Sequence, residues 1–163
     1  MHIEIAPILQ SDTLAFRECL DRVARERRFL ASLEAPPLEH MQEFVAEGLR
    51  NGVPRVVAKA EGRLIGWCDI QPGWHHTLRH CGSLGMGVLP EFRGQGLGQR
   101  LLESCMAIAR QVGVTRVELE TRSDNEQALS LYRRMGFQFE GVKRRGIQVD
   151  GEYKDTTTMA LLL

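Results

Sequence analysis

The chain has 163 residues, of which 43% are hydrophobic and 26% are charged, values typical of a soluble globular domain. This length predicts a single domain over residues 1–163 that folds without a disulfide or a structural metal. The 21 basic residues balance the 21 acidic ones, which argues against a nucleic acid or an anionic membrane as the partner.

The first third of the chain predicts a strand and two helices. Residues 2–8 are short and apolar-rich and favour a strand, and residues 13–29 then favour a helix. Apolar side chains recur at helical spacing over residues 38–49. Asn51-Gly52 follows them and supplies a left-handed stop, so the second helix ends there.

The middle of the chain is rich in strands. Residues 55–60 and 64–70 are β-rich runs around the turn Glu61-Gly62, which predicts a hairpin. After a polar loop, residues 81–89 predict a strand that contains three glycines. Glycine weakens a strand, and its usual reason is a bulge or the close approach of a ligand or another backbone. These glycines are Gly82, Gly85 and Gly87.

The second half alternates helices and strands before a final hairpin. A capping-box spacing between Ser123 and Glu126 marks the start of its second helix. Asp150-Gly151 marks the turn of the hairpin. Together with the first half, this order predicts an α/β or α+β domain with a mixed sheet flanked by helices. The elements are helix 97–112, strand 114–121, helix 123–135, strand 137–148 and strand 153–163.

The segment from Gly87 to Gly98 has the layout of an anion site. A strand runs through a glycine-rich loop directly into a long amphipathic helix. Glycines let consecutive backbone N–H groups turn toward one point, and the helix adds its unpaired amides and the positive end of its dipole. A pyrophosphate fits this layout, although a flexible connection with permissive glycines is an equally good reading of the glycines alone.

Two other phosphate-binding classes fit less well. A P-loop needs Lys followed by Ser or Thr after its last glycine, whereas Gln99 and Arg100 follow Gly98 here. A dinucleotide-binding Rossmann site would use Glu118 or Glu120 for the ribose. The glycine pattern of a Rossmann site is G-x-G-x-x-G, however, whereas the loop here reads G-x-G-x-G.

The cysteines and the hydropathy indicate a cytoplasmic protein with free thiols. No two cysteines form a C-x-x-C pair, so neither a zinc site nor a thiol-exchange site is predicted. The first twenty residues carry charges rather than a signal-peptide core, and no stretch approaches the roughly 18 apolar residues of a spanning helix. The cysteines are Cys19, Cys68, Cys81 and Cys105.

Two linked motifs resemble the GNAT superfamily of acetyl-CoA-dependent N-acetyltransferases. Residues 93–98, Arg-Gly-Gln-Gly-Leu-Gly, are similar to its (Gln/Arg)-x-x-Gly-x-(Gly/Ala) motif. Residues 125–137 are similar to its asparagine helix and the following strand. The resemblance implies a mostly antiparallel sheet of about seven strands with a central splayed parallel pair and about four helices. It also implies acetyl-CoA as co-substrate and no metal.

The resemblance also implies which residues bind the coenzyme. Backbone amides of the glycine loop would hold its pyrophosphate, and the edge of the central strand would bind the pantetheine arm. Val88 is the expected donor to the thioester carbonyl. Gly85 and Gly87 would allow the close approach. The implied binding residues are Met86, Gly87, Val88, Arg93, Gly94, Gln95, Gly96, Leu97, Gly98, Gln99 and Asn125, of which Asn125 could equally be a helix cap.

The resemblance implies that Tyr132 is the acid that assists the departing thiolate. Its position on the apolar helix stripe would otherwise favour simple packing. Attack requires a neutral amine, so a base or a water relay is also expected. Glu118, Glu120 and His80 are the candidates, each with a solvated strand edge as the alternative. Some family members place a glutamate where Gly82 and Ser83 stand here, which leaves the base open.

The sequence therefore predicts an N-acetyltransferase that acts on a primary amine, such as an amino acid or another small metabolite. Trp74, His75 and His76 are candidates for a lid on the acceptor side. The alternatives are a non-catalytic acyl-CoA sensor, a protein N-terminal acetyltransferase and, more distantly, an NAD(P)-binding Rossmann protein. The C-terminal hairpin favours a homodimer.

Overall fold

Seven strands form one continuous sheet in the computed structural model, which describes residues 1–163. The strand order is β1-β2-β3-β4-β5-β7-β6, and only the β4–β5 pair is parallel. This confirms the predicted mixed sheet and excludes the parallel sheet of a Rossmann protein. The strands are β1 (Ile3–Pro7), β2 (Arg55–Ala60), β3 (Arg63–Pro72), β4 (Cys81–Val88), β5 (Arg116–Arg122), β6 (Gln138–Val149) and β7 (Glu152–Leu162), and the helices are α1 (Thr13–Ala24), α2 (Leu38–Arg50), α3 (Leu97–Gln111) and α4 (Glu126–Arg134).

Two tight turns fix the antiparallel hairpins. Glu61 and Gly62 have φ angles of 49° and 83°, and Asp150 and Gly151 have φ angles of 51° and 79°. Two consecutive left-handed residues define the turn whose twist matches that of the flanking strands. The turn chemistry of these residue pairs therefore sets the hairpins β2–β3 and β6–β7, as predicted.

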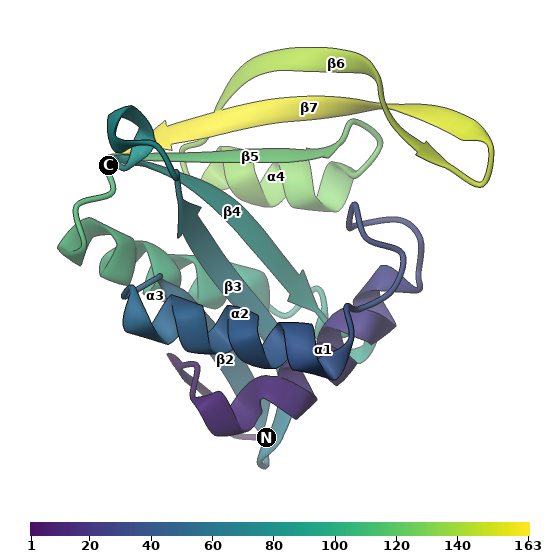
Figure 1. Cartoon of the computed structure of the whole chain (residues 1–163). Helices are drawn as coiled ribbons and strands as arrows, with labels where there is room; N and C mark the ends of the chain where they lie inside the picture. The colour runs from purple at the N-terminus through teal and green to yellow at the C-terminus, as the bar shows by residue number, and fades with distance from the viewer.

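The parallel strands β4 and β5 stay together for only three residues. Cys81–Ser83 of β4 pair with Arg116–Glu118 of β5. Beyond Ser83, β4 pairs with no strand except β3, and beyond Glu118, β5 pairs with no strand except β7. Figure 1 shows the two strands diverging from their paired end. The predicted splay is confirmed, and it leaves one edge of each strand unpaired in the middle of the sheet.

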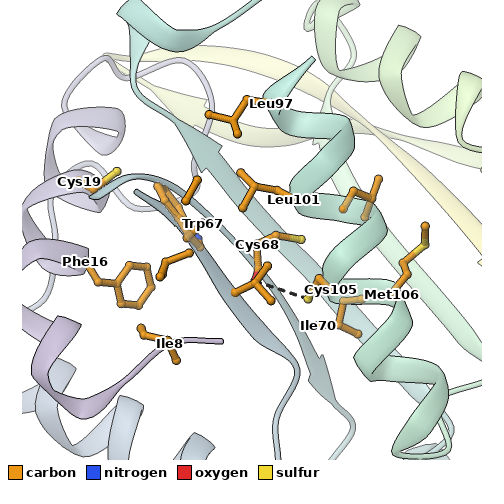
Figure 2. Packing of buried hydrophobic residues seen from close by; sticks show 14 of the residues in the cluster. Ile8, Phe16, Cys19, Trp67, Cys68, Ile70, Leu97, Leu101, Cys105 and Met106 are labelled. Carbon is orange, nitrogen blue, oxygen red and sulfur yellow. Dashed lines mark hydrogen bonds between the residues drawn. The ribbon is translucent and has the colours of Figure 1, made fainter. Parts of the chain in front are cut away.

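Helices cover both faces of the sheet and seal its core (Figure 1). On one face, Phe16 of α1 meets Trp67 of β3 edge to face, with ring centroids 5.7 Å apart. On the other face, Leu101 and Cys105 of α3 are fully buried, and Cys105 Sγ lies 3.5 Å from the carbonyl oxygen of Cys68 (Figure 2). Helix α3 is therefore anchored by its apolar stripe, which fixes the position of its N-terminus.

The three glycines of β4 are explained by side chains of the neighbouring strand β3. A Cβ on Gly87 would lie 2.3 Å from the Trp67 ring, and one on Gly82 would lie 2.3 Å from the Cγ2 of Ile70. A Cβ on Gly85 would lie 2.9 Å from a carboxylate oxygen of Asp69. Internal packing thus requires these glycines, and the approach of a ligand at Gly85 and Gly87 stays a prediction.

Two helix ends differ from the sequence-based prediction. Helix α1 ends at Ala24 rather than near Phe29, since Arg27 adopts a φ of 58°, which is incompatible with a right-handed helix. Helix α4 is capped by Asn125, whose side-chain oxygen accepts a hydrogen bond from the Ala128 amide at 3.2 Å. The capping box predicted at Ser123 is therefore wrong, and that hydroxyl is bonded to Thr157 instead.

All four cysteines are free thiols, as predicted. Three of them are buried, and burial raises the pKa of Cys19 to about 12, so this thiol stays protonated near neutral pH. No helix of the structure combines the length and the apolar character needed to cross a membrane.

A buried ion pair beneath β4 supports the sheet and allows a stability prediction. The Arg55 side chain is 2% exposed, its Nε lies 3.4 Å from Asp69 Oδ2, and it stacks over Phe44 at 4.0 Å. Its Nη2 has no hydrogen-bond partner. Burial raises the pKa of Asp69 to about 6, although Arg55 opposes this shift, so the carboxyl is ionised above that pH.

We expect Asp69→Asn to destabilise the protein by about 3–5 kcal/mol at pH 7.5, because it leaves a buried guanidinium without a counter-charge. Urea unfolding measures the effect. Glu43→Gln is the control, since it removes an exposed partner of Arg50 and should cost less than about 1 kcal/mol. Equal losses in the two variants would contradict the prediction.

Candidate active site

The splay between β4 and β5 opens into a cavity of about 460 Å³. Its walls come from the diverging parts of both strands, the loop before α3 and the first turn of that helix, one side of α4, and the segment between α1 and α2. Thirteen of its 25 lining residues are hydrophobic. A cavity that is largely apolar, with polar groups at a few places, is the usual form of a small-molecule site.

One end of this cavity is a cradle of free backbone amides. Gly94 and Gly96 have φ angles of 71° and 78°, and a Cβ on either would meet nothing within 4 Å. The amides of residues 94–96 donate to no protein acceptor, and the first bond of α3 runs from Arg100 N to Gly96 O. Because the amides of the first helical turn are unpaired as well, a run of donors faces the cavity at the positive end of the helix dipole.

The structure brings together nearly all of the predicted coenzyme-binding residues. Gln95 is the exception, because it does not line the cavity and its side chain donates to the carbonyl oxygen of Glu91 at 3.2 Å. The lining residues among the predicted set are Met86, Gly87, Val88, Arg93, Gly94, Gly96, Leu97, Gly98, Gln99 and Asn125. Their roles in binding stay predictions.

The Arg93 side chain is committed to a contact inside the protein. Its Nη1 lies 2.8 Å from Glu26 Oε2, its Nε donates to the Val88 carbonyl at 2.7 Å, and its guanidinium stacks over Phe29 at 4.6 Å. Its guanidinium thus ties the segment after α1 to the cradle, and a contact of Arg93 with the coenzyme stays a prediction.

Asn125 also has internal partners. Besides capping α4, it donates through Nδ2 to Thr121 Oγ1 at 3.3 Å. Both the oxygen and the nitrogen of its side-chain amide are therefore hydrogen-bonded within the protein. Its position in the cavity wall is as predicted, while its side chain acts first as the cap that we named as the alternative.

Tyr132 lies in the cavity wall with a free hydroxyl. Its side chain is 7% exposed, and its ring packs against Phe137 with centroids 5.6 Å apart. The hydroxyl makes no hydrogen bond within the protein, although buried phenols usually have a partner. Burial raises the pKa of Tyr132 well above its ordinary value, so the phenol stays protonated and can donate a hydrogen bond.

Glu120 is the carboxylate of the cavity among the three predicted bases. It accepts hydrogen bonds at 2.6 Å from Lys143 Nζ and at 2.6 Å from Thr156 Oγ1. These two bonds lower the pKa of Glu120 below its ordinary value. Glu118 does not line the cavity and is paired with Arg116 at 3.2 Å.

The structure places His80 outside the cavity, against our prediction of a base there. His80 precedes Cys81, at the end where β4 and β5 are still paired, and its carbonyl accepts bonds from Thr115 and Arg116. Its exposed ring contacts the Cys81 sulfur at 3.3 Å. The splay opens at the other end of the strand, so His80 does not line the cavity.

The candidate lid is also elsewhere. Trp74 is 85% exposed, and neither it nor the two histidines that follow line the cavity. The segment after α1 contributes Phe29, Leu30 and Ala31 instead. The sequence offered no signal for this segment except an apolar pair after a run of arginines, because a helix was expected to continue through it.

Comparison with known proteins identifies the family. The model of the acetyltransferase (GNAT) family matches residues 17–137. The chain is 39% identical over 101 residues to the N-alpha-acetyltransferase RimI of Mycobacterium tuberculosis, a match that covers 59% of each chain. It is 28% identical over 140 residues to the L-amino acid N-acetyltransferase AaaT of Escherichia coli, covering 84% of this chain and 85% of that one.

Further similarities extend over most of the chain. An L-methionine sulfoximine/L-methionine sulfone acetyltransferase of Pseudomonas aeruginosa is 31% identical over 132 residues, covering 77% of this chain and 74% of that one. The structure of a GNAT-family acetyltransferase from Streptococcus pneumoniae superposes with a TM-score of 0.93 at 25% identity, covering 99% of this chain and 100% of that one. YncA of Salmonella typhimurium, solved with acetyl-CoA, superposes with a TM-score of 0.91 at 19% identity, covering 98% and 93%.

These findings confirm the predicted resemblance and its fold. The amide cradle, the splayed strands and the seven-stranded sheet are the features that the motifs implied. The matched segment of 17–137 includes the cradle and Tyr132 together. The chain belongs to the GNAT family of acetyltransferases, which use acetyl-CoA as the acetyl donor.

Proposed function

We propose that this protein transfers the acetyl group of acetyl-CoA to the primary amine of a small metabolite, such as an amino acid. The observation that carries the proposal is the run of unpaired amides at the N-terminus of α3, which opens onto a cavity long enough to include Tyr132 and Glu120. The relatives that act on L-amino acids or on methionine sulfoximine support a small acceptor.

The cradle fits a diphosphate. A Cβ at Gly94 or Gly96 would point into open space, and the amides there have no internal acceptor. Beyond Ser83, β4 pairs with no strand except β3. Apart from the Val88 carbonyl, which accepts a bond from Arg93, its other edge is therefore free to bind the amide groups of a pantetheine arm. Acetyl-CoA, when bound, supplies an acetyl group activated as a thioester.

Two side chains of the cavity would then manage charge and protons. Glu120 is ionised, so it would bind an ammonium group, orient the amine and pass its proton to water. The Tyr132 hydroxyl would donate a hydrogen bond to the sulfur as negative charge develops there. Because burial raises the pKa of this phenol, complete proton transfer is uphill, and we assign it stabilisation by a hydrogen bond.

A protein N-terminal acetyltransferase is the second candidate. The similarity to RimI favours it, since that relative is an N-alpha-acetyltransferase. The matched segment covers less than two thirds of RimI, and the amino-acid-acetylating relatives match over a longer part of this chain. We therefore keep the small amine as the first proposal. The homodimer stays a prediction, for which the exposed Phe139 and Val142 of the edge strand β6 are the support.

Thiol release from acetyl-CoA over a panel of amino acids, small amines and short peptides tests the proposed function. We expect turnover with small primary amines. Turnover with peptides alone would favour the N-terminal acetyltransferase. Tight binding of CoA by calorimetry without turnover on any amine would favour the non-catalytic sensor.

Glu120→Gln should lower kcat/KM for the amine by about 10–100-fold, since it removes the charge that binds and orients an ammonium group. Hydrogen bonds lower the pKa of Glu120, so it is ionised throughout pH 5–9. The wild-type kcat/KM should therefore rise with pH as the amine loses its proton, with no inflection from Glu120. Steady-state kinetics across this range measure both effects.

Glu118→Gln is the matched control, because Glu118 lies on the same strand but outside the cavity. Its kcat/KM should stay within about twofold of the wild type, in line with the small energies of exposed ion pairs. Equal losses in the two variants would show that general electrostatics, rather than a contact with the amine, accounts for the effect.

A further inference from the structure

The Glu120–Lys143 pair is a neutral pair of charges, in which Glu120 lines the cavity and Lys143 holds it from β6. Lys143 Nζ lies 2.6 Å from Glu120 Oε2, and the two side chains are 60% and 38% exposed. Lys143 comes from β6, the edge strand, where the pairing with β7 becomes irregular after this residue. An ammonium has three donors, and only one hydrogen bond from this one is made within the protein.

The two arginines of β5 both have carboxylate partners. Arg116 is paired with both Glu118 and Glu140. Arg122 is held by Asp124 through Nε and Nη2. Lys143 is thus the cation that contacts a cavity carboxylate and still has donors to offer, and exposure lets it change partners without leaving a buried charge unpaired.

We propose that Lys143 binds the α-carboxylate of a free amino acid while Glu120 receives its ammonium group. This inference rests on the proposed function and narrows it to acceptors with an amine and a carboxylate on the same carbon. The two groups of such a zwitterion are one carbon apart, so they can reach a cation and an anion that are already in contact. One ion pair within the protein is exchanged for two with the substrate.

Charge balance gives this arrangement its selectivity. A neutral pair receives a neutral zwitterion, and each charge in the complex has a partner of opposite sign. A carboxamide or a peptide N-terminus offers no anion to Lys143. When its ammonium group binds Glu120, Lys143 loses its ion pair and forms no new one with the substrate. Because Lys143 is well exposed and water can solvate it, we expect a discrimination of about tenfold rather than the larger factors of fully buried sites.

The test compares L-leucine, L-methionine and L-phenylalanine with their carboxamides in the full-length protein. Lys143→Met should raise KM for the free amino acids about tenfold or more with a smaller change in kcat, and should leave the carboxamides unchanged or improved. Lys143→Arg should restore most of the difference, since it keeps the positive charge. The ammonium groups of carboxamides are more acidic than those of amino acids, which by itself changes the rate. The ratio of kcat/KM for an amino acid to that for its carboxamide is therefore compared between variants.

Lys154→Met is the control, because Lys154 is paired with Glu152 at 3.2 Å and makes no contact with Glu120. It should leave kcat and KM unchanged for both amino acids and carboxamides, and thermal melting should show that all variants are folded. If Lys143→Met lowered kcat/KM equally for amino acids and carboxamides, or lowered neither, the inference would be overturned. Wild-type turnover confined to amines or peptides without a neighbouring carboxylate would also overturn it, although the proposed acetyl transfer would then stand.

Discussion

Gly96→Glu should weaken the binding of CoA by about 100-fold or more while leaving the protein folded. Gly96 is the N-cap of α3, with a φ of 78° and no side-chain cap. A glutamate there would place a negative charge among the amides proposed to bind a diphosphate, and would strain the backbone that aims them. Loss of two charge-assisted hydrogen bonds, at about 1.5–3 kcal/mol each, accounts for this factor. Isothermal titration with CoA measures it.

Gly113→Glu provides the matched control at the opposite end of the same helix. Gly113 has a φ of 89°, and a Cβ there also meets open space, so the backbone strain is comparable. A negative charge at the C-terminal end of a helix is itself unfavourable, so this variant should lose at least as much stability. If it binds CoA as weakly as Gly96→Glu does, the amide cradle is not the binding site.

Tyr132→Phe should lower kcat by about 10–100-fold with less than a twofold change in the affinity for CoA. Tyr132 lines the cavity and its hydroxyl has no hydrogen-bond partner in the protein, so removing the hydroxyl breaks no internal hydrogen bond. The ring keeps its contact with Phe137, and the melting temperature should stay within about 2 °C. Steady-state kinetics with the best amine of the panel measure kcat.

Tyr153→Phe is the control, because Tyr153 is the other tyrosine of the chain and lies exposed on β7 beneath Arg145. Its kcat should not change. Unchanged turnover in Tyr132→Phe as well would mean that Tyr132 serves only to pack α4 against the sheet, which is the alternative that its apolar surroundings suggested.

Local chemistry explains why much of the fold and the cradle could be predicted. Glu61-Gly62 and Asp150-Gly151 specify their turns within two residues, so the hairpins follow from sequence alone. The amide cradle likewise depends on glycines and a helix start that are adjacent in the chain. Features of this kind require no knowledge of distant partners.

The parts of the site that sequence did not reveal depend on contacts between distant segments. The partner of Arg93 is Glu26, 67 residues away, and the partner of Glu120 is Lys143 on another strand. His80 was misplaced because the end at which two parallel strands diverge is set by tertiary packing rather than by residue type. The segment after α1 was missed for a local reason, a left-handed Arg27 within a helical pattern.

The two ends of the cavity differ in how firmly the rest of the protein holds them. The amide cradle begins a helix whose apolar stripe is locked into the core through Leu101 and Cys105. The opposite rim includes Glu120, which is paired with Lys143 at the surface. Such exposed pairs contribute little to stability. Substitutions at the rim therefore cost little stability. Related proteins can differ there and bind different amines, while the cradle that binds the acetyl donor stays the same.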